Sequence, residues 1–389
     1  MKNLILAYKR GHHRINAMKK AIESLGQTVD VKTDSFDTIE GSYDRIWTLS
    51  ESLLPIQAQL EAKLGLKNLS VSASEVLIDK KKFDDFCIAI GLEDMIPKSV
   101  IPTCKEDLLD LTDGDLIVKP TVGSGTKLDG FSYTSYHSKE ELLNNAPDDF
   151  FEINKNGFTS PEFNNVQSYY MVQEMLPTYA KLYAYYAYID MDGNVHKQFP
   201  VRLDTNIIRD GNSKYYNHPY IVESIEEDEV PEIVKESTEI FYESTADVLG
   251  VRNMFISGPD FYVYDGITKM IDCNPRIGTG TTLMDKAMGF TVIPDIIANK
   301  KVQYNKHFLW RHAALKPGVV KSVKDYSHLK KYISETSHEL CEGTVITEQT
   351  NVSDNLFNMS IVITGTKRPD MHKTYQAVKE ELQNCIEYY

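Results

Sequence analysis

The feature that most restricts the fold of this chain is a pair of apolar strands joined by the dipeptide Asp265-Gly266. This dipeptide between two runs of aromatic and β-branched residues is typical of a two-residue β-hairpin. Asp260 begins the first strand, and Asp272 and Asn274 end the second. Because an antiparallel hairpin brings these ends together, and because the i, i+2 spacing puts Asp272 and Asn274 on one side of their strand, we expect a cluster of oxygen ligands there.

Two carboxylates and one amide oxygen are hard ligands that suit Mg²⁺, which takes its remaining ligands from water and substrate phosphates. Arg276 lies two residues beyond Asn274 and is able to reach the same anion. A surface hairpin with capping acids would carry the same residues. The hairpin alone therefore leaves a metal site and a plain surface turn as equal alternatives.

A second anion-binding candidate lies in the segment DLIVKPTVGSGTK. Lys119 ends its apolar strand, and the loop that follows contains Gly123, Ser124, Gly125 and Thr126. Backbone N–H groups of such a loop are able to surround phosphate oxygens. The segment lacks the GxxxxGK[ST] pattern of a P-loop. A simple turn between two strands would have the same composition.

Two other segments complete the set of candidate ligand-binding residues. Lys80 opens an expected helix over residues 79–91 and supplies another cation for a phosphate. The strand YYMVQEML carries near its end the pair Gln173 and Glu174, whose backbone and carboxylate are suited to an adenine edge. Each segment is unremarkable by itself, and their order along the chain carries the information.

The order is a DK helix, a VKP strand with a glycine loop, a VQE strand, and a hairpin ending in D-x-N-P-R. It resembles the ATP-grasp superfamily, and within it the carboxylate-amine and carbamoyl-phosphate-synthase-like ligases, including amino-acid and dipeptide ligases. The resemblance covers about residues 4 to 300. It implies an ATP-grasp fold, α/β and α+β in class, with an N-terminal open α/β domain and a small C-terminal α+β unit.

The resemblance also implies roles for individual residues. Lys80 and Lys119 match the two lysines that bind nucleotide phosphates, and Arg276 matches the arginine that meets the transferred phosphoryl group and the acyl substrate. The mobile lid loop matches Gly123, Ser124, Gly125 and Thr126; the adenine hinge matches Gln173, Glu174, Met175 and Leu176; the ligands of Mg²⁺, or alternatively Mn²⁺, match Asp260, Asp272 and Asn274.

The sequence departs from the pattern of this superfamily at two places. Asp272 stands where the second metal ligand is usually Glu, one methylene longer. An acid commonly follows the hinge to hold the ribose, yet Pro177 to Lys181 contain none. The resemblance therefore assigns no residue to the ribose.

Five units are expected along the chain. The alternation of strands and helices over the first 70 residues is typical of a small open α/β sheet. The polar stretch 147–168 is expected to be an exposed loop of the lid. The units are an N-terminal α/β domain (1–75), a helical connector (76–114), a lid subdomain (115–178), a central subdomain with the metal site (179–300) and a C-terminal α+β unit (301–389).

The function implied is that of an ADP-forming, ATP-dependent ligase, which joins a carboxylate to an amine through an acylphosphate. An amino acid or small peptide is the expected substrate. Two alternatives stay open: an ATP-grasp kinase or carboxylase, and a non-catalytic nucleotide-binding regulatory protein. A dinucleotide-dependent oxidoreductase is excluded, because Gly11 is the sole glycine of the first strand-helix turn and no GxGxxG exists there.

The composition of the chain limits the classes of molecule that it is expected to bind. The 389 residues include 56 acids and 42 lysines and arginines, and the net charge of -14 opposes binding to nucleic acid. Five well-separated cysteines without a CxxC pair fit reduced thiols of a cytoplasmic protein. No stretch approaches the ~18 apolar residues of a membrane span. We expect small-molecule carboxylate and amine substrates and no association with membranes. Whether the chain forms a homodimer stays open.

The carboxylate substrate has weaker candidates. Arginine binds small carboxylates in a bidentate manner, and Arg202 and Arg311 lie in segments able to line a central cavity. Arg209 is a similar candidate. Surface arginines are more common than ligand-binding ones, so the sequence leaves both interpretations open for these residues.

Overall fold

The computed structural model describes the chain except residues 9–11, 124–133, 161–162, 164, 210–214, 301, 303–305, 314, 336–339 and 348–358. Its first unit is a parallel sheet in the order β2-β1-β3, which confirms the expected α/β start. Helices connect these strands, and α2 carries Pro55 in its first turn, where a missing N–H costs nothing. The elements are β1 (Lys2–Leu6), α1 (His12–Ser24), β2 (Thr28–Lys32), β3 (Arg45–Thr48) and α2 (Leu54–Leu64).

Two helices connect this unit to the next sheet, α3 (Val71–Ile78) and α4 (Lys80–Ala89). Ser70 caps α3 by accepting a hydrogen bond from the N–H of Ala73. Asp79 ends α3 and caps α4, because its carboxylate accepts hydrogen bonds from the N–H groups of Lys81 and Lys82. This sharp junction places Lys80 at the beginning of α4. Single-turn 3₁₀ helices occupy Phe36–Thr38, Glu51–Leu53, Glu93–Met95, Glu106–Asp110, Glu227–Glu229 and Ser327–Leu329.

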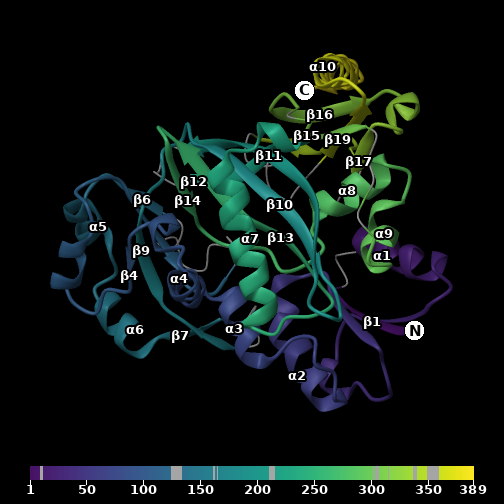
Figure 1. Cartoon of the computed structure of the whole chain (residues 1–389). Helices are drawn as coiled ribbons and strands as arrows, with labels where there is room; N and C mark the ends of the chain where they lie inside the picture. The colour runs from purple at the N-terminus through teal and green to yellow at the C-terminus, as the bar shows by residue number, and fades with distance from the viewer. Residues whose placement is uncertain are drawn as a thin grey trace.

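The next sheet has the order β4-β9-β5-β6 and lies apart from the central sheet, with α5 and α6 beside it (Figure 1). One expectation fails here. The described residues of the stretch 147–168 include α6, β7 and β8, and Phe150 and Phe163 are buried. The many turn-forming residues of this stretch make its short helix and strands hard to predict from the sequence. The elements are β4 (Ser99–Val100), β5 (Leu116–Pro120), β6 (Thr134–Tyr136), α5 (Lys139–Asn145), α6 (Phe150–Asn156), β7 (Phe158–Ser160), β8 (Val166–Ser168) and β9 (Tyr170–Glu174).

The centre of the molecule is an eight-stranded antiparallel sheet in the order β14-β13-β10-β11-β12-β15-β19-β17. Alternate residues of β10 face different cores: Tyr183 and Tyr185 pack with α7 (Glu232–Asp247), and Tyr186 packs with α8 (Thr279–Ala287) and α9 (Val292–Ile297). The strands are β10 (Lys181–Ile189), β11 (Val195–Arg209), β12 (Tyr215–Ser224), β13 (Met254–Tyr264), β14 (Ile267–Met270), β15 (His307–His312), β17 (Ile333–Glu335) and β19 (Met359–Gly365).

The N-terminal and C-terminal parts both pack on this sheet. Helix α1 lies beside α8 (Thr279–Ala287) and α9 (Val292–Ile297), and α10 (Arg368–Asn384) covers the C-terminal strands (Figure 1). A small sheet of β16 (Gly318–Val323), β18 (Val345–Ile346) and β20 (Ile386–Tyr388) completes the chain. Because β15, β17 and β19 belong to the central sheet, that sheet continues past residue 300, and the five domain boundaries stay predictions. Among the described helices, none has the length and apolar character needed to cross a membrane.

The packing of α4 on α7 yields a stability prediction. The ring of Phe241 lies 5.7 Å from that of Phe83 and 6.2 Å from that of Phe86, centroid to centroid. Phe241 is 0% exposed, whereas its neighbour Ile240 is 40% exposed. We expect Phe241→Ala to lower the free energy of unfolding by about 3–5 kcal/mol, because it leaves a cavity between the two helices.

Chemical denaturation followed by circular dichroism measures this change. Ile240→Ala, on the same turn of α7, is the matched control and should change stability by about 0.5 kcal/mol or less. Equal effects of the two substitutions would contradict the packing described for Phe241.

Candidate functional site

The hairpin of β13 and β14 forms at the expected turn. Asp265 and Gly266 both have positive φ, 47° and 79°, as a type I′ turn requires. Beyond the paired strands, the N–H of Asp260 donates to the carbonyl oxygen of Asp272 at 3.0 Å. Two further backbone hydrogen bonds of 2.8 and 2.9 Å join Ser257 and Asn274. The backbone thus brings the two ends of the hairpin together.

This backbone pairing holds two acids next to each other. Burial and the negative charge of Asp272 raise the pKa of the Asp260 carboxyl group well above its ordinary value. The side-chain oxygen of Asn274 accepts a hydrogen bond from the Arg276 guanidinium at 3.4 Å. The end of the hairpin therefore offers two carboxylates and an amide oxygen, with a guanidinium beside them.

Two buried lysines lie close to these acids. Lys119 is 4% exposed at the end of β5. Its pKa is lowered to about 8, because burial and the nearby positive charge of Lys80 disfavour the protonated form. The carboxylates of Asp272 and Asp84 act in the opposite direction. Lys119 of the smaller sheet is thus near enough to Asp272 of the central hairpin for the charge of that carboxylate to act on it.

Lys80 reaches the same place from α4. Its N–H donates to the carbonyl oxygen of Thr121 at 2.8 Å, and its ammonium group donates to the carbonyl oxygen of Gly123 at 2.9 Å. Gly123 has a φ of 136°, which favours glycine. The remaining residues of the expected lid loop, Ser124, Gly125 and Thr126, lie outside the described residues.

One acid of the cluster was missed from the sequence. Glu51 follows β3, and its carboxylate interacts electrostatically with Arg276, Lys80 and Asp272. Burial raises its pKa above the ordinary value, the two cations oppose this shift, and Asp272 adds to it. Ligands of open α/β sheets gather at the carboxyl ends of strands, so the position of Glu51 after the strand RIWT was an available indication.

The expected adenine hinge lies at the end of β9, which pairs with β5. The carboxylate of Glu174 accepts a hydrogen bond from the N–H of Thr112 at 3.0 Å, and the N–H of Met175 donates to the carbonyl oxygen of Asp115 at 2.8 Å. The side-chain nitrogen of Gln173 is buried and has no hydrogen-bond partner in the described part of the chain. Among the described residues of this hinge, Gln173 is thus the one whose side-chain N–H group is able to donate to a ligand. Leu176 packs on the central core.

Arg202 and Arg311 lie elsewhere. Ala184 pairs with Asp260 and with Val201, so Arg202 is on the opposite face of the sheet from Asp260. Arg202 forms an ion pair with Glu223, which also accepts a hydrogen bond from His372 of α10.

Arg311 shares that opposite face, because it pairs with Ile221, two residues before Glu223. Its guanidinium lies 4.6 Å from the ring centre of Tyr375. The structure does not bring Arg202 or Arg311 to the acid and lysine cluster. Their assignment to substrate stays a prediction that this placement does not support. The side chain of Arg209 lies outside the described residues.

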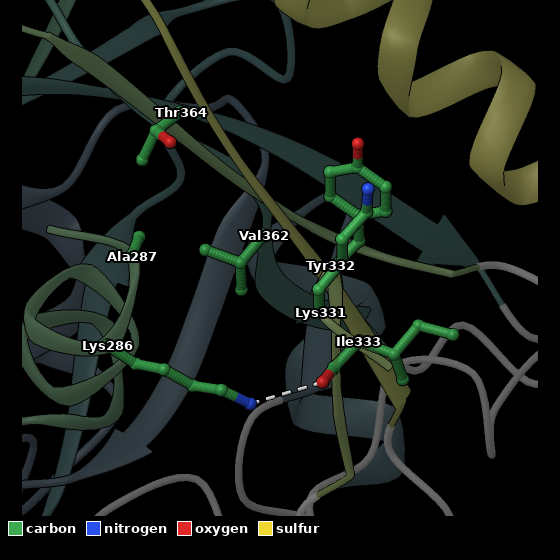
Figure 2. A pocket seen from close by; sticks show the side chains of 7 residues that line it. All are labelled: Lys286, Ala287, Lys331, Tyr332, Ile333, Val362 and Thr364. Carbon is green, nitrogen blue, oxygen red and sulfur yellow. Dashed lines mark hydrogen bonds between the residues drawn. The ribbon is translucent and has the colours of Figure 1, made fainter. Parts of the chain in front are cut away.

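A cavity of about 160 Å³ lies away from the cluster, between the end of α8 and strands β17 and β19 (Figure 2). The Lys286 ammonium group points across it and donates to the carbonyl oxygen of Ile333 at 3.2 Å. Its other lining residues are Ala287, Lys331, Tyr332, Val362 and Thr364. None of the predicted site residues that the structure describes lines this cavity, so the converging charges, and not the cavity, mark the candidate site.

Known structures resemble the whole chain. An L-amino acid ligase from Bacillus licheniformis matches with a TM-score of 0.69 and 14% identity, over 100% of this chain and 99% of that chain. A phosphoribosylglycinamide synthetase from Anaerococcus prevotii has a TM-score of 0.63 and 16% identity, over 100% and 99%. A biotin carboxylase from Campylobacter jejuni, solved as a βγ-ATP complex, has a TM-score of 0.63 and 13% identity, over 99% and 91%.

The sequence itself matches neither a protein-family model nor a curated protein. At these identities the structural similarity establishes the fold and not the activity. It extends from the N-terminal parallel sheet to the C-terminal unit, which agrees with the arrangement expected from the order of the motifs. The chain has the ATP-grasp fold.

Proposed function

We propose that the chain is an ATP-dependent, ADP-forming ligase that joins a carboxylate to an amine through an acylphosphate, with an amino acid or small peptide as substrate. One observation carries the proposal. Lys80, Lys119 and Arg276 come from three separate parts of the chain and lie around the end of the hairpin: Lys119 interacts with Asp272 and Lys80, and Arg276 donates to Asn274. The similarity to an L-amino acid ligase and a phosphoribosylglycinamide synthetase supports the same reaction class.

The residues of the hairpin fit a divalent cation. Asp260, Asp272 and Asn274 would hold it through oxygen atoms, which Mg²⁺ prefers and Mn²⁺ also accepts. Burial first, and then the negative charge of Asp272, raise the pKa of Asp260 above its ordinary value. Among the described residues no group of three or more His, Cys, Asp or Glu side chains is placed to hold a metal ion, and the proposed set accordingly consists of two carboxylates and one amide. When bound, the ion withdraws charge from phosphate oxygens.

The cations suit the first chemical step. A carboxylate is a poor electrophile, so it first takes the γ-phosphoryl group of ATP and becomes an acylphosphate, with release of ADP. Catalysis of phosphoryl transfer depends mainly on positioning and charge neutralisation. Lys80 and Lys119 would hold the phosphates in place, and Arg276 would balance the negative charge that develops on the transferred group.

In the second step the amine attacks the acyl carbon, the bond from that carbon to the phosphate oxygen breaks, and phosphate and a proton leave. The acylphosphate must be kept from water until this happens. The sheet that carries Lys119, together with residues 123–126, is the proposed lid. The unpaired amide of Gln173 would meet the adenine at the other end of the nucleotide.

The same fold also suits a kinase or a carboxylase, and the similarity to a biotin carboxylase favours this as the second candidate. A non-catalytic nucleotide-binding protein is the third. We favour small-molecule substrates, since the net charge of -14 opposes polyanionic partners. We also favour a cytoplasmic location, since five well-separated cysteines without a CxxC pair fit reduced thiols. A homodimer stays open.

Hydroxylamine separates these candidates. It attacks an acylphosphate to give a hydroxamate, whereas the product of a hydroxyl kinase does not react in this way. We expect the protein with ATP, Mg²⁺, hydroxylamine and a mixture of the standard amino acids to release ADP and form hydroxamates, measured by their coloured iron complexes. Bicarbonate in place of the amino acids is the comparison for a carboxylase.

Two outcomes would contradict the proposed ligase function. ADP release that depends on bicarbonate and gives no hydroxamate would indicate a carboxylase. ATP binding without ADP release, over amino acids, small peptides and other carboxylic acids, would indicate a regulatory protein.

Lys119→Met tests the cation set directly. The substitution keeps the length of the side chain and removes its charge from the end of β5. We expect turnover to fall at least ~100-fold, as it does when other preorganised charge stabilisers are removed. Single-turnover ADP formation measures the effect.

Lys181→Met is the matched control, because Lys181 is exposed at the start of β10. It should leave ADP formation unchanged. If Lys119→Met retained full turnover, Lys119 would have no role in phosphoryl transfer.

A further inference from the structure

One tyrosine of the central sheet lies beside the candidate site. Tyr186 of β10 pairs with Ser257 of β13, and Ser257 forms a bridge with Asn274. Residues that are directly opposite each other in an antiparallel pair have neighbouring side chains on one face. Tyr186 is also two residues beyond Ala184, which pairs with Asp260. The side chains of Tyr186 and Asp260 therefore lie on the same face of the sheet.

The hydroxyl group of Tyr186 reaches the beginning of α8, next to the guanidinium of Arg276. A Cβ atom placed on Gly280 would lie 3.3 Å from this hydroxyl. A Cβ atom placed on Gly278 would lie 3.1 Å from the Arg276 guanidinium and 3.9 Å from the hydroxyl of Ser257. Because Gly278 and Gly280 are two residues apart at the start of one helix, the Tyr186 hydroxyl and the Arg276 guanidinium border the same short stretch of backbone.

Two aromatic contacts fix the ring that carries this hydroxyl. The ring of Tyr186 lies 5.0 Å from that of Phe199 and 5.9 Å from that of Phe255, centroid to centroid, and both contacts are edge-on. Such contacts stabilise an aromatic pair beyond the burial of its surface. The side-chain packing therefore sets the position of the hydroxyl before any ligand binds.

The hydroxyl of Tyr186 differs from those of its neighbours on the strand in its hydrogen bonding. The hydroxyl groups of Tyr185 and Tyr188 donate to other side chains at 2.8 and 2.9 Å. The hydroxyl of Tyr186 has no hydrogen-bond partner among the residues that the structure describes. Tyr186 is 8% exposed, and a hydroxyl that is largely removed from water is more stable when it finds a partner. The geometry thus offers this hydroxyl to a ligand.

The surroundings of the hydroxyl favour an acidic ligand group. Burial first, and then the negative charge of Asp260, raise the pKa of Tyr186, and the positive charge of Arg276 opposes this shift. The hydroxyl therefore keeps its proton at neutral pH and is able to donate. In the proposed reaction Arg276 balances the charge on the transferred phosphoryl group, so the carboxylate that receives this group comes to the same place. A carboxylate accepts several hydrogen bonds, and Arg276 alone does not use all of them.

We propose that the Tyr186 hydroxyl donates a hydrogen bond to the carboxylate of the acyl substrate beside Arg276, and that Gly280 leaves the space that this contact needs. The inference rests on the proposed ligase function and deepens it, because it assigns a residue that binds the acid. Tyr186 takes no part in binding ATP.

The test uses the full chain and two substitutions. Tyr186→Phe removes the hydroxyl and keeps the packing of the ring. Gly280→Ala brings a methyl group to 3.3 Å from the hydroxyl, which then has to shift by a few tenths of an ångström. Each standard amino acid is supplied singly with ATP, Mg²⁺ and hydroxylamine. ADP and hydroxamate are then measured over a range of concentrations of the amino acid that the wild type uses best.

We expect Tyr186→Phe to raise KM for this amino acid about tenfold, the loss typical of a hydrogen bond to a charged group, and to leave KM for ATP unchanged. Gly280→Ala should raise KM for the amino acid in the otherwise unchanged chain. It should add nothing to Tyr186→Phe, because the atom that it crowds is then absent. Tyr185→Phe is the matched control, since Tyr185 packs in the core on the other face of the strand, and both of its KM values should equal those of the wild type.

Three results would overturn the inference and leave the ligase function standing. An unchanged KM for the amino acid in Tyr186→Phe would mean that the hydroxyl does not contact the acid. Equal increases of KM for the amino acid and for ATP, with a lowered melting temperature, would make Tyr186 a structural residue. Additive effects of Tyr186→Phe and Gly280→Ala would mean that Gly280 acts independently of the hydroxyl. If the wild type forms no hydroxamate with any amino acid, the ligase function itself fails, and the role of Tyr186 fails with it.

Discussion

The candidate site depends on like charges held together by the backbone. Asp260 and Asp272 are neighbours because the N–H of Asp260 binds the carbonyl oxygen of Asp272, and not because their side chains attract. Lys80 and Lys119 are neighbours because the backbone of Lys80 binds the carbonyl oxygen of Thr121, just beyond β5. Each pair repels internally, and attraction between the pairs offsets part of that cost. Such an arrangement is suited to a ligand that carries charges of both signs, as a nucleotide with its metal ion does.

Two apolar contacts and one buried hydroxyl group hold together the units that carry these charges. The rings of Phe83 and Phe241 fix α4 against α7, and therefore fix Lys80 relative to the central sheet. The buried hydroxyl of Tyr242 lies within hydrogen-bonding distance of the carbonyl oxygens of Tyr185 and Ile256 in the sheet, and its single proton is shared between such acceptors. Ile277 shares a core with Leu49, which fixes the Arg276 loop against the N-terminal sheet. The cluster is thus assembled from units that are distant in sequence, and small shifts between these units would change every distance in it.

The two faces of the central sheet have different roles. Asp260 of the candidate site lies on one face. The opposite face, near β12, carries the ion pair of Arg202 with Glu223, and Glu223 also contacts His372 of α10. In the sequence Arg202 and Arg311 are both suited to carboxylate binding. The alternation of side chains along the strands places both of them on the face opposite Asp260. The C-terminal unit contributes strands β15, β17 and β19 to this sheet, and α10 contacts the face away from the cluster through His372.

The sequence by itself determined the features that depend on local geometry. The turn at Asp265 and Gly266, the spacing of Asp272 and Asn274, and the order of the motifs each follow from residues close together in the chain, and the fold expected from them is the one observed. The place of Glu51, the face on which Arg202 lies, and the burial of Phe150 in an apparently polar stretch required the tertiary structure. The physical reason is that sheet register and packing between distant units decide which side chains meet, and a shift of one residue in a strand would move each side chain to the other face.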